Sequence, residues 1–245
     1  MAGAVEDGVW TARVVRLVLA AHGSADPRSA ANARAVANQI RFMRPGLQVR
    51  VAFCDLNTPR LPDVLTPDAV VTPFLLADAY HARIDIPGQI AASGLPVRQA
   101  DVLGEDDRLI AVLHERLAGL GVTTDDPELG VAVVAIGSTH AAANARTTQV
   151  ADILHAGAQW ACTTTAFATV NGPSPADAVV ELRRRGARRV VIAPWFLAPG
   201  KLTDRVAKYA ATEGIPMAPP LGAHRLVAET VLDRFEAAIA QSVAA

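Results

Sequence analysis

Two histidines and an aspartate each follow a short apolar run in the N-terminal half of the sequence. His22 follows the run 17–21, Asp55 follows 49–53, and His81 follows 69–74 after a short loop. Such runs are typical of buried strands, and the carboxyl ends of parallel strands meet at one edge of a sheet, where α/β proteins bind ligands. Two imidazoles and a carboxylate are typical ligands of a divalent transition metal, and imidazole also exchanges protons near neutral pH. The pattern therefore predicts a metal site made by these three residues.

These side chains meet only if the strands are parallel, and the spacing of apolar residues favours that arrangement. Helical periodicity covers 29–44, 81–92 and 106–117, alternating with the apolar runs and with a further short run at 96–100. This alternation of strand and helix is typical of a parallel sheet with helices on both faces.

The same alternation starts again after a polar stretch at 121–129. Segment 131–138 matches 17–24, and 166–167 matches 52–53, both at an offset of 114 residues (Gly137 against Gly23). Segment 194–198 matches 73–77 at an offset of 121 (Pro194 against Pro73), and 221–222 matches 103–104 at an offset of 118 (Gly222 against Gly104). Matches that keep their order and nearly constant offsets predict a duplication. We expect two tandem α/β domains over 1–122 and 130–245, packed as a monomeric pseudo-dimer with a cleft between them.

The two halves differ at the residues that could do chemistry. Counted by the offsets, Ile136 stands opposite His22, Leu202 opposite His81, and Thr169 opposite Asp55. Taken singly, each histidine could be a hydrogen-bonded loop residue, and Asp55 could cap a helix or bond within its own loop. Together, at three strand ends and without counterparts in the second half, the three residues favour a site in the N-terminal domain and a degenerate C-terminal one.

Composition and charge exclude several other classes of protein. With 23 basic and 24 acidic residues, the net charge of −1 provides no basic surface for a nucleic-acid backbone. No apolar segment approaches the roughly 18 residues that a membrane helix needs, and the first ten residues carry Glu6 and Asp7 without a basic, apolar leader. Two cysteines are too few for a disulfide framework or a thiolate zinc site. We expect a cytoplasmic protein with neither nucleic-acid nor membrane partners.

Two segments of the N-terminal half resemble the motifs of a known enzyme family. Segment 20–28 resembles the strand-end His-Gly-Ser motif of the sirohydrochlorin chelatases, the small class II chelatases of sirohaem and cobalamin synthesis. Segment 72–87 resembles their second motif, a Pro-aromatic strand end followed by His and then Asp-Ile-Pro. Asp55 stands where relatives often have Glu, and Ala79 stands where they commonly have Gly. The chain resembles the long form, in which two chelatase-like domains are fused.

The resemblance implies a reaction, its substrates and its residues. It implies insertion of Fe²⁺ or Co²⁺ into sirohydrochlorin without ATP, the metal being a substrate and no permanent cofactor being needed. His22 and His81 would bind the ion and accept the macrocycle's protons, with Asp55 as a third ligand. Arg28 and Arg83 are candidates to orient the carboxylates of this anionic tetrapyrrole because they neighbour the motifs.

A non-catalytic carrier of metal or tetrapyrrole with the same fold is the alternative, since fold does not determine function. Retention of both histidines favours the enzyme, because tetrapyrrole binding alone requires neither.

Overall fold

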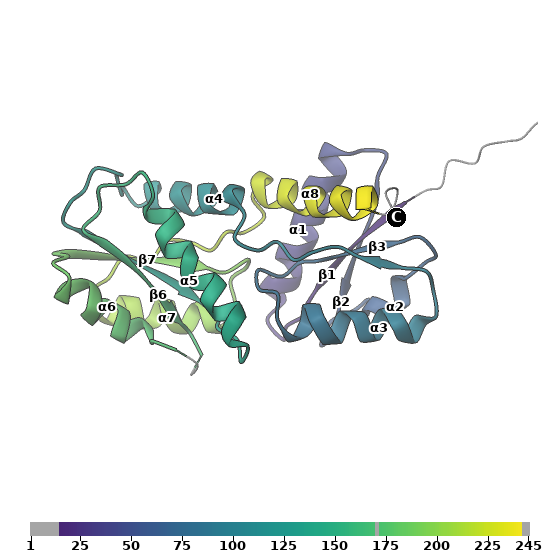
Figure 1. The fold of residues 1–245 in the computed structure, drawn as a ribbon, viewed down its shortest axis with the longest axis horizontal. Helices are drawn as coiled ribbons and strands as arrows, with labels where there is room; N and C mark the ends of the chain where they lie inside the picture. Colours follow the sequence, from purple (N-terminus) through teal and green to yellow (C-terminus); the bar gives the residue numbers. More distant parts are fainter. Residues whose placement is uncertain (1–14, 170–171, 242–245) are drawn as a thin grey trace, which may run out of the picture.

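The computed structural model describes residues 15–169 and 172–241, in two lobes that lie side by side (Figure 1). Glu6, Asp7 and the outer ends of the expected domains 1–122 and 130–245 lie outside the described residues. The elements in chain order are β1 (Arg16–Ala21), α1 (Pro27–Met43), β2 (Gln48–Phe53), α2 (Leu61–Val64), β3 (Val70–Pro73), the π-helix η1 (His81–Asp85), α3 (Ile86–Ser93), β4 (Arg98–Gln99), α4 (Asp107–Ala118), β5 (Leu129–Ala135), α5 (Ala141–His155), β6 (Cys162–Phe167), α6 (Pro175–Arg184), β7 (Arg189–Trp195), α7 (Lys201–Thr212) and α8 (Arg225–Gln241). No helix in the described ranges is long and apolar enough to cross a membrane.

Each lobe is built on one parallel sheet, which confirms the expected fold class. The strand orders are β2-β1-β3-β4 in the N-terminal lobe and β6-β5-β7 in the C-terminal lobe, and every strand pair is parallel. The apolar runs at 17–21, 49–53 and 69–74 form strands as predicted, whereas the run at 96–100 contributes only the two-residue β4.

The side chains of each central strand alternate between two cores. Leu17 and Leu19 of β1 pack into a core that continues across both lobes, and Val18 and Ala20 pack into a smaller core beneath α2 and α3. In β5, Val131 and Val133 join the shared core, while its other face packs against α6 and α7. Because a strand projects successive side chains to opposite faces, a continuous apolar run is what a sheet covered on both sides requires.

The last helix of each half packs on the sheet of the other half. Helix α4 lies against α5 and β7 of the C-terminal lobe, and α8 lies against α1 and β3 of the N-terminal lobe (Figure 1). The boundaries 1–122 and 130–245 therefore remain a prediction. They describe the repeat in the sequence, whereas each packed lobe contains the last helix of the other half.

Two reciprocal arginine contacts secure the exchange. Arg116 of α4 donates to the carbonyl oxygen of Leu221 (2.9 Å), and Arg234 of α8 donates to that of Leu103 (2.9 Å). Both the arginines and the carbonyls are 118 residues apart, which is the offset of the repeat in this region. The contacts are thus the two halves of one pseudo-symmetric interaction.

Asp106 adds a charged contact at the same place. Its carboxylate accepts a hydrogen bond from Arg108 N (3.0 Å) at the start of α4 and pairs with Arg234 of α8 (2.9 Å). Burial would raise the pKa of Asp106, but the hydrogen bonds from Arg108 and the charge of Arg234 outweigh it and lower that pKa to about 2.

The segment 81–92, predicted as one helix, begins with a π-helical turn. The N–H of Ile86 donates to the carbonyl of His81, and α3 follows with Pro87 in its first turn. Proline has no N–H for the carbonyl four residues earlier, and its ring crowds that carbonyl, so a widened turn relieves the conflict. The widened turn carries His81.

Candidate active site

A glycine turn places His22 directly beyond the end of β1. Gly23 has φ +97°, and a Cβ on it would lie 1.8 Å from the backbone oxygen of Asp55, so no other residue fits. The N–H of Asp55 donates to the carbonyl of His22 (2.9 Å). The loops after β1 and β2 are therefore held together by backbone contacts, and His22 projects from them.

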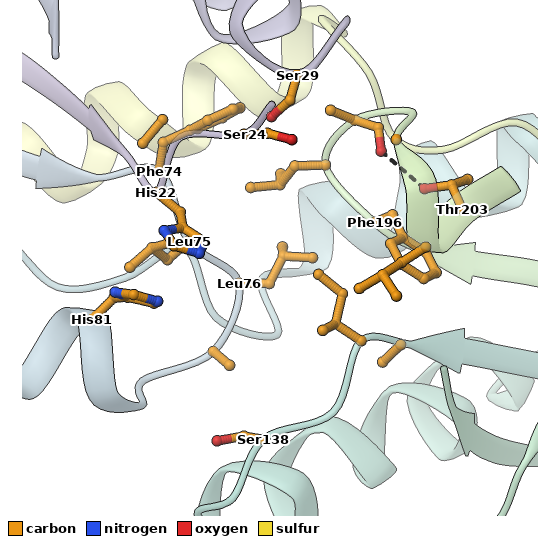
Figure 2. Close-up of a pocket in the computed structure, with 18 of the residues that line it drawn as sticks. His22, Ser24, Ser29, Phe74, Leu75, Leu76, His81, Ser138, Phe196 and Thr203 are labelled. Carbon is orange, nitrogen blue, oxygen red and sulfur yellow. Dashed lines mark hydrogen bonds between the residues drawn. The ribbon is translucent and has the colours of Figure 1, made fainter. Parts of the chain in front are cut away.

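The structure brings His22 and His81 together. Their ring centroids are 3.9 Å apart with the planes inclined by 34°, and Figure 2 shows both rings on the same side of a cavity. Tyr80 stands edge-on to His81, with the ring centroids 5.5 Å apart. The two imidazoles predicted from separate strand ends thus form a pair.

Asp85, which the sequence reasoning missed as a site residue, holds His81 in position. Its Oδ2 lies 3.0 Å from Nδ1 of His81, and its Oδ1 accepts from Nε2 of Gln89 (2.8 Å). A carboxylate that accepts the Nδ1 proton leaves Nε2 of the imidazole free to bind a metal. The four-residue spacing from His81, on a predicted helix, was the signal that could have revealed it.

His22 is set up to be neutral. Burial lowers the pKa of His22 below its ordinary value of 6.5, and the neighbouring His81 lowers it further. A neutral imidazole is the form that binds metals and accepts protons.

Asp55 does not join the histidine pair. Its carboxylate accepts hydrogen bonds from Arg60 Nη1 (2.8 Å) and from the N–H of Leu56 (2.8 Å), which lower the pKa of Asp55. Its side chain is 57% exposed. Within residues 15–169 and 172–241, no three His, Cys, Asp or Glu side chains gather closely enough to hold a metal ion. The role of Asp55 as a third ligand remains a prediction.

The histidine pair lines a cleft of about 720 Å³ between the lobes. Its walls come mainly from the loops after β1 and β3 on one side and after β5 and β7 on the other: residues 21–25, 74–77, 79–81, 135–138 and 195–203. Leu56, Tyr80 and Ile136 line it with large exposed apolar side chains. A cleft of this size and apolar character suits an organic ligand.

The arginines near the motifs are already bonded to carboxylates of the protein. Arg28 pairs with Asp26 (2.6 Å) and, across the lobes, with Asp204 (2.5 Å), while Arg83 pairs with Asp78 (2.6 Å). The side chain of Lys201, by contrast, lines the cleft and makes no hydrogen bond or ion pair with the described residues, although its charge helps to lower the pKa of Asp26. Lys201 is therefore the cation best placed to meet an anionic ligand.

Comparison with known proteins identifies the family. The model of the CbiX family matches residues 16–120 and again residues 130–238. The chain belongs to the CbiX family. This confirms the resemblance seen in the two motifs, and the double match agrees with the long, duplicated form.

Named relatives of this CbiX chain are chelatases. Over 200 residues it is 24% identical to sirohydrochlorin cobaltochelatase of Priestia megaterium, a match that covers 76% of this chain and 65% of that protein. Over 182 residues it is 24% identical to sirohydrochlorin ferrochelatase of Bacillus subtilis, covering 70% and 69% of the two chains. The structure of SirB from Bacillus subtilis with Fe³⁺ shares the fold, with a TM-score of 0.80, 21% identity, and coverage of 94% and 97%.

Proposed function

We propose that this CbiX protein inserts a divalent metal, Fe²⁺ or Co²⁺, into sirohydrochlorin without ATP, in sirohaem or cobalamin synthesis. The observation that carries the proposal is the pair of imidazoles, 3.9 Å apart, on the wall of an apolar cleft of about 720 Å³. The family and the named relatives support the substrate. The metal is a substrate of this reaction and leaves with the product.

His22 and His81 bind the incoming ion, and Asp85 orients His81 through its Nδ1. Asp55 becomes the third ligand when its carboxylate exchanges Arg60 for the ion. That exchange is inexpensive because a solvent-exposed salt bridge contributes little to stability. A site with so few protein ligands suits a donor that must release its ion, whereas a closed four-ligand site would retain it.

The same imidazoles balance the protons of the reaction. Two pyrrole N–H bonds of the macrocycle break as two metal–nitrogen bonds to those nitrogens form. The ion leaves His22 and His81 as it moves into the ring, so each freed imidazole nitrogen accepts one proton. The charge of +2 stays in the site, now on two imidazolium groups, until water removes the protons.

The test is anaerobic absorbance spectroscopy of sirohydrochlorin with Fe²⁺ or Co²⁺ and a substoichiometric amount of protein. We expect many turnovers for the natural chain and for His155→Ala, a control outside the cleft, and loss of turnover in His22→Ala and His81→Ala. The faster ion indicates the pathway. Full activity without the histidines would contradict the mechanism, and a spectral change that stops at one equivalent would establish the carrier instead.

The fused halves act as a monomer, because each already supplies the helix that covers the other. Light scattering should give a mass near 25.6 kDa. A mass twice as large would contradict this arrangement.

A further inference from the structure

Ile136 occupies in the C-terminal lobe the place that His22 occupies in the N-terminal lobe. The carbonyl of Ile136 accepts from the N–H of Thr169 (3.0 Å), as that of His22 accepts from the N–H of Asp55 (2.9 Å). The next residue is a glycine with positive φ in both lobes, +97° at Gly23 and +91° at Gly137. The two backbones are therefore equivalent, and only the side chains differ.

Leu202 stands in the same relation to His81. In the sheets, Pro73 of β3 is opposite Ala20 and Pro194 of β7 is opposite Val134, so the two prolines occupy equivalent register positions. Counting eight residues on from each proline leads to His81 at the start of η1 and to Leu202 at the start of α7. Both positions in the C-terminal lobe therefore carry an aliphatic side chain where the N-terminal lobe carries an imidazole.

Ile136 and Leu202 both line the cleft that contains the histidine pair. Ile136 is 46% exposed, and Phe196, which Figure 2 shows on the side of the cavity away from the histidines, adds to the same apolar wall. An exposed apolar surface inside a cleft is stabilised when an apolar ligand covers it. This apolar wall can therefore pack against a ligand, but it cannot coordinate a metal ion or accept a proton.

We propose that Ile136 and Leu202 form the wall that contacts the face of the macrocycle opposite the histidine pair, so that the ion enters, and the protons leave, on one face only. This inference rests on the proposed function and adds the orientation of its substrate. Aliphatic side chains neither bind a divalent ion nor accept a proton. A planar macrocycle between the lobes therefore meets ligands and bases on its N-terminal side and a chemically inert surface on the other.

The first test compares Ile136→Ala with Val180→Ala. Val180 is a large apolar residue of α6 that is 66% exposed and does not line the cleft. We expect Ile136→Ala to raise the dissociation constant for sirohydrochlorin about tenfold, with the Co²⁺ affinity of the protein alone unchanged, and Val180→Ala to change neither. Unchanged sirohydrochlorin affinity in Ile136→Ala would overturn the proposal.

The second test restores the missing symmetry with the double variant Ile136→His/Leu202→His. If the two positions are equivalent to His22 and His81, a titration with Co²⁺ alone should show one additional bound ion per chain relative to the natural protein. No additional ion in a variant with an unchanged circular dichroism spectrum would overturn the equivalence. Both tests use binding, so failure of turnover in the natural chain would refute the proposed function without deciding this inference.

Discussion

Replacement of Asp85 by asparagine is expected to weaken metal binding while leaving the fold intact. The carboxylate of Asp85 accepts two hydrogen bonds, from Nδ1 of His81 at 3.0 Å and from Nε2 of Gln89 at 2.8 Å. An amide of the same size offers only one acceptor oxygen, so its NH₂ group must face one of these donors. If it faces His81, the proton of that imidazole moves to Nε2 and blocks the nitrogen that binds the metal.

The size of this effect follows from the role of outer ligands in metal sites. Removing the partner that orients a ligating histidine weakens metal affinity or activity about 10- to 100-fold, equivalent to about 1.4–2.7 kcal/mol. The measurement is a Co²⁺ titration of the protein alone, followed by the turnover assay at the same pH. Asp152→Asn, a change of the same kind on the exposed surface of α5, is the matched control. Natural Co²⁺ affinity and turnover in Asp85→Asn would refute the positioning role.

Four further perturbations test the fold and the cleft. Gly23→Ala should lower the free energy of unfolding by more than about 2 kcal/mol, because the new Cβ collides with backbone at a positive φ; urea denaturation measures this. Asp106→Asn should lower the free energy of unfolding by about 1–2 kcal/mol at pH 7. The folded-state pKa of Asp106 is about 2, below the ordinary value of 3.8, so its carboxylate stabilises the fold above about pH 4 and this contribution disappears as the pH falls toward 2. The variant and the natural chain should therefore have the same stability near pH 2. Lys201→Met should raise the KM for sirohydrochlorin several-fold without changing Co²⁺ affinity, and an unchanged KM would remove Lys201 from substrate binding. A fragment of residues 1–122 should form a dimer by light scattering, because α4 of one copy can take the place of α8 on another; a folded monomer would contradict this.

The sheets could be predicted because their strands carry a local signal. Short apolar runs at 17–21 and 131–135 are buried on both faces, which only a covered parallel strand requires. The meeting of His22 and His81 followed from the same reasoning, since residues that follow parallel strands arrive at one edge of the sheet.

Other features depend on partners that the local sequence does not specify. The periodicity of α4 and α8 shows which face of each helix is buried but not which sheet covers that face. The exchange of these helices between the lobes could therefore not be predicted from the apolar pattern. The fate of Asp55 depended on Arg60, five residues away in a loop whose conformation no periodicity describes. Pro87 indicated that the helix over 81–92 would be disturbed. Whether the result is a π-helical turn, however, depends on the conformation of the residues before the proline.

The geometry of the cleft explains why the proposed reaction needs no nucleotide. The exchanged helices and the ion pairs Arg28–Asp204 and Asp78–Arg146 join the lobes on either side of the cleft, so its width is set by the fold. In the proposed reaction, the ion moves from two imidazoles, or three ligands with Asp55, to the four nitrogens of the macrocycle. In the proposed mechanism, one chelating macrocycle replaces separate protein ligands, and the released imidazoles take up the two pyrrole protons. An aliphatic wall on the far side makes the transfer directional, because the ring finds ligands and bases on only one of its faces.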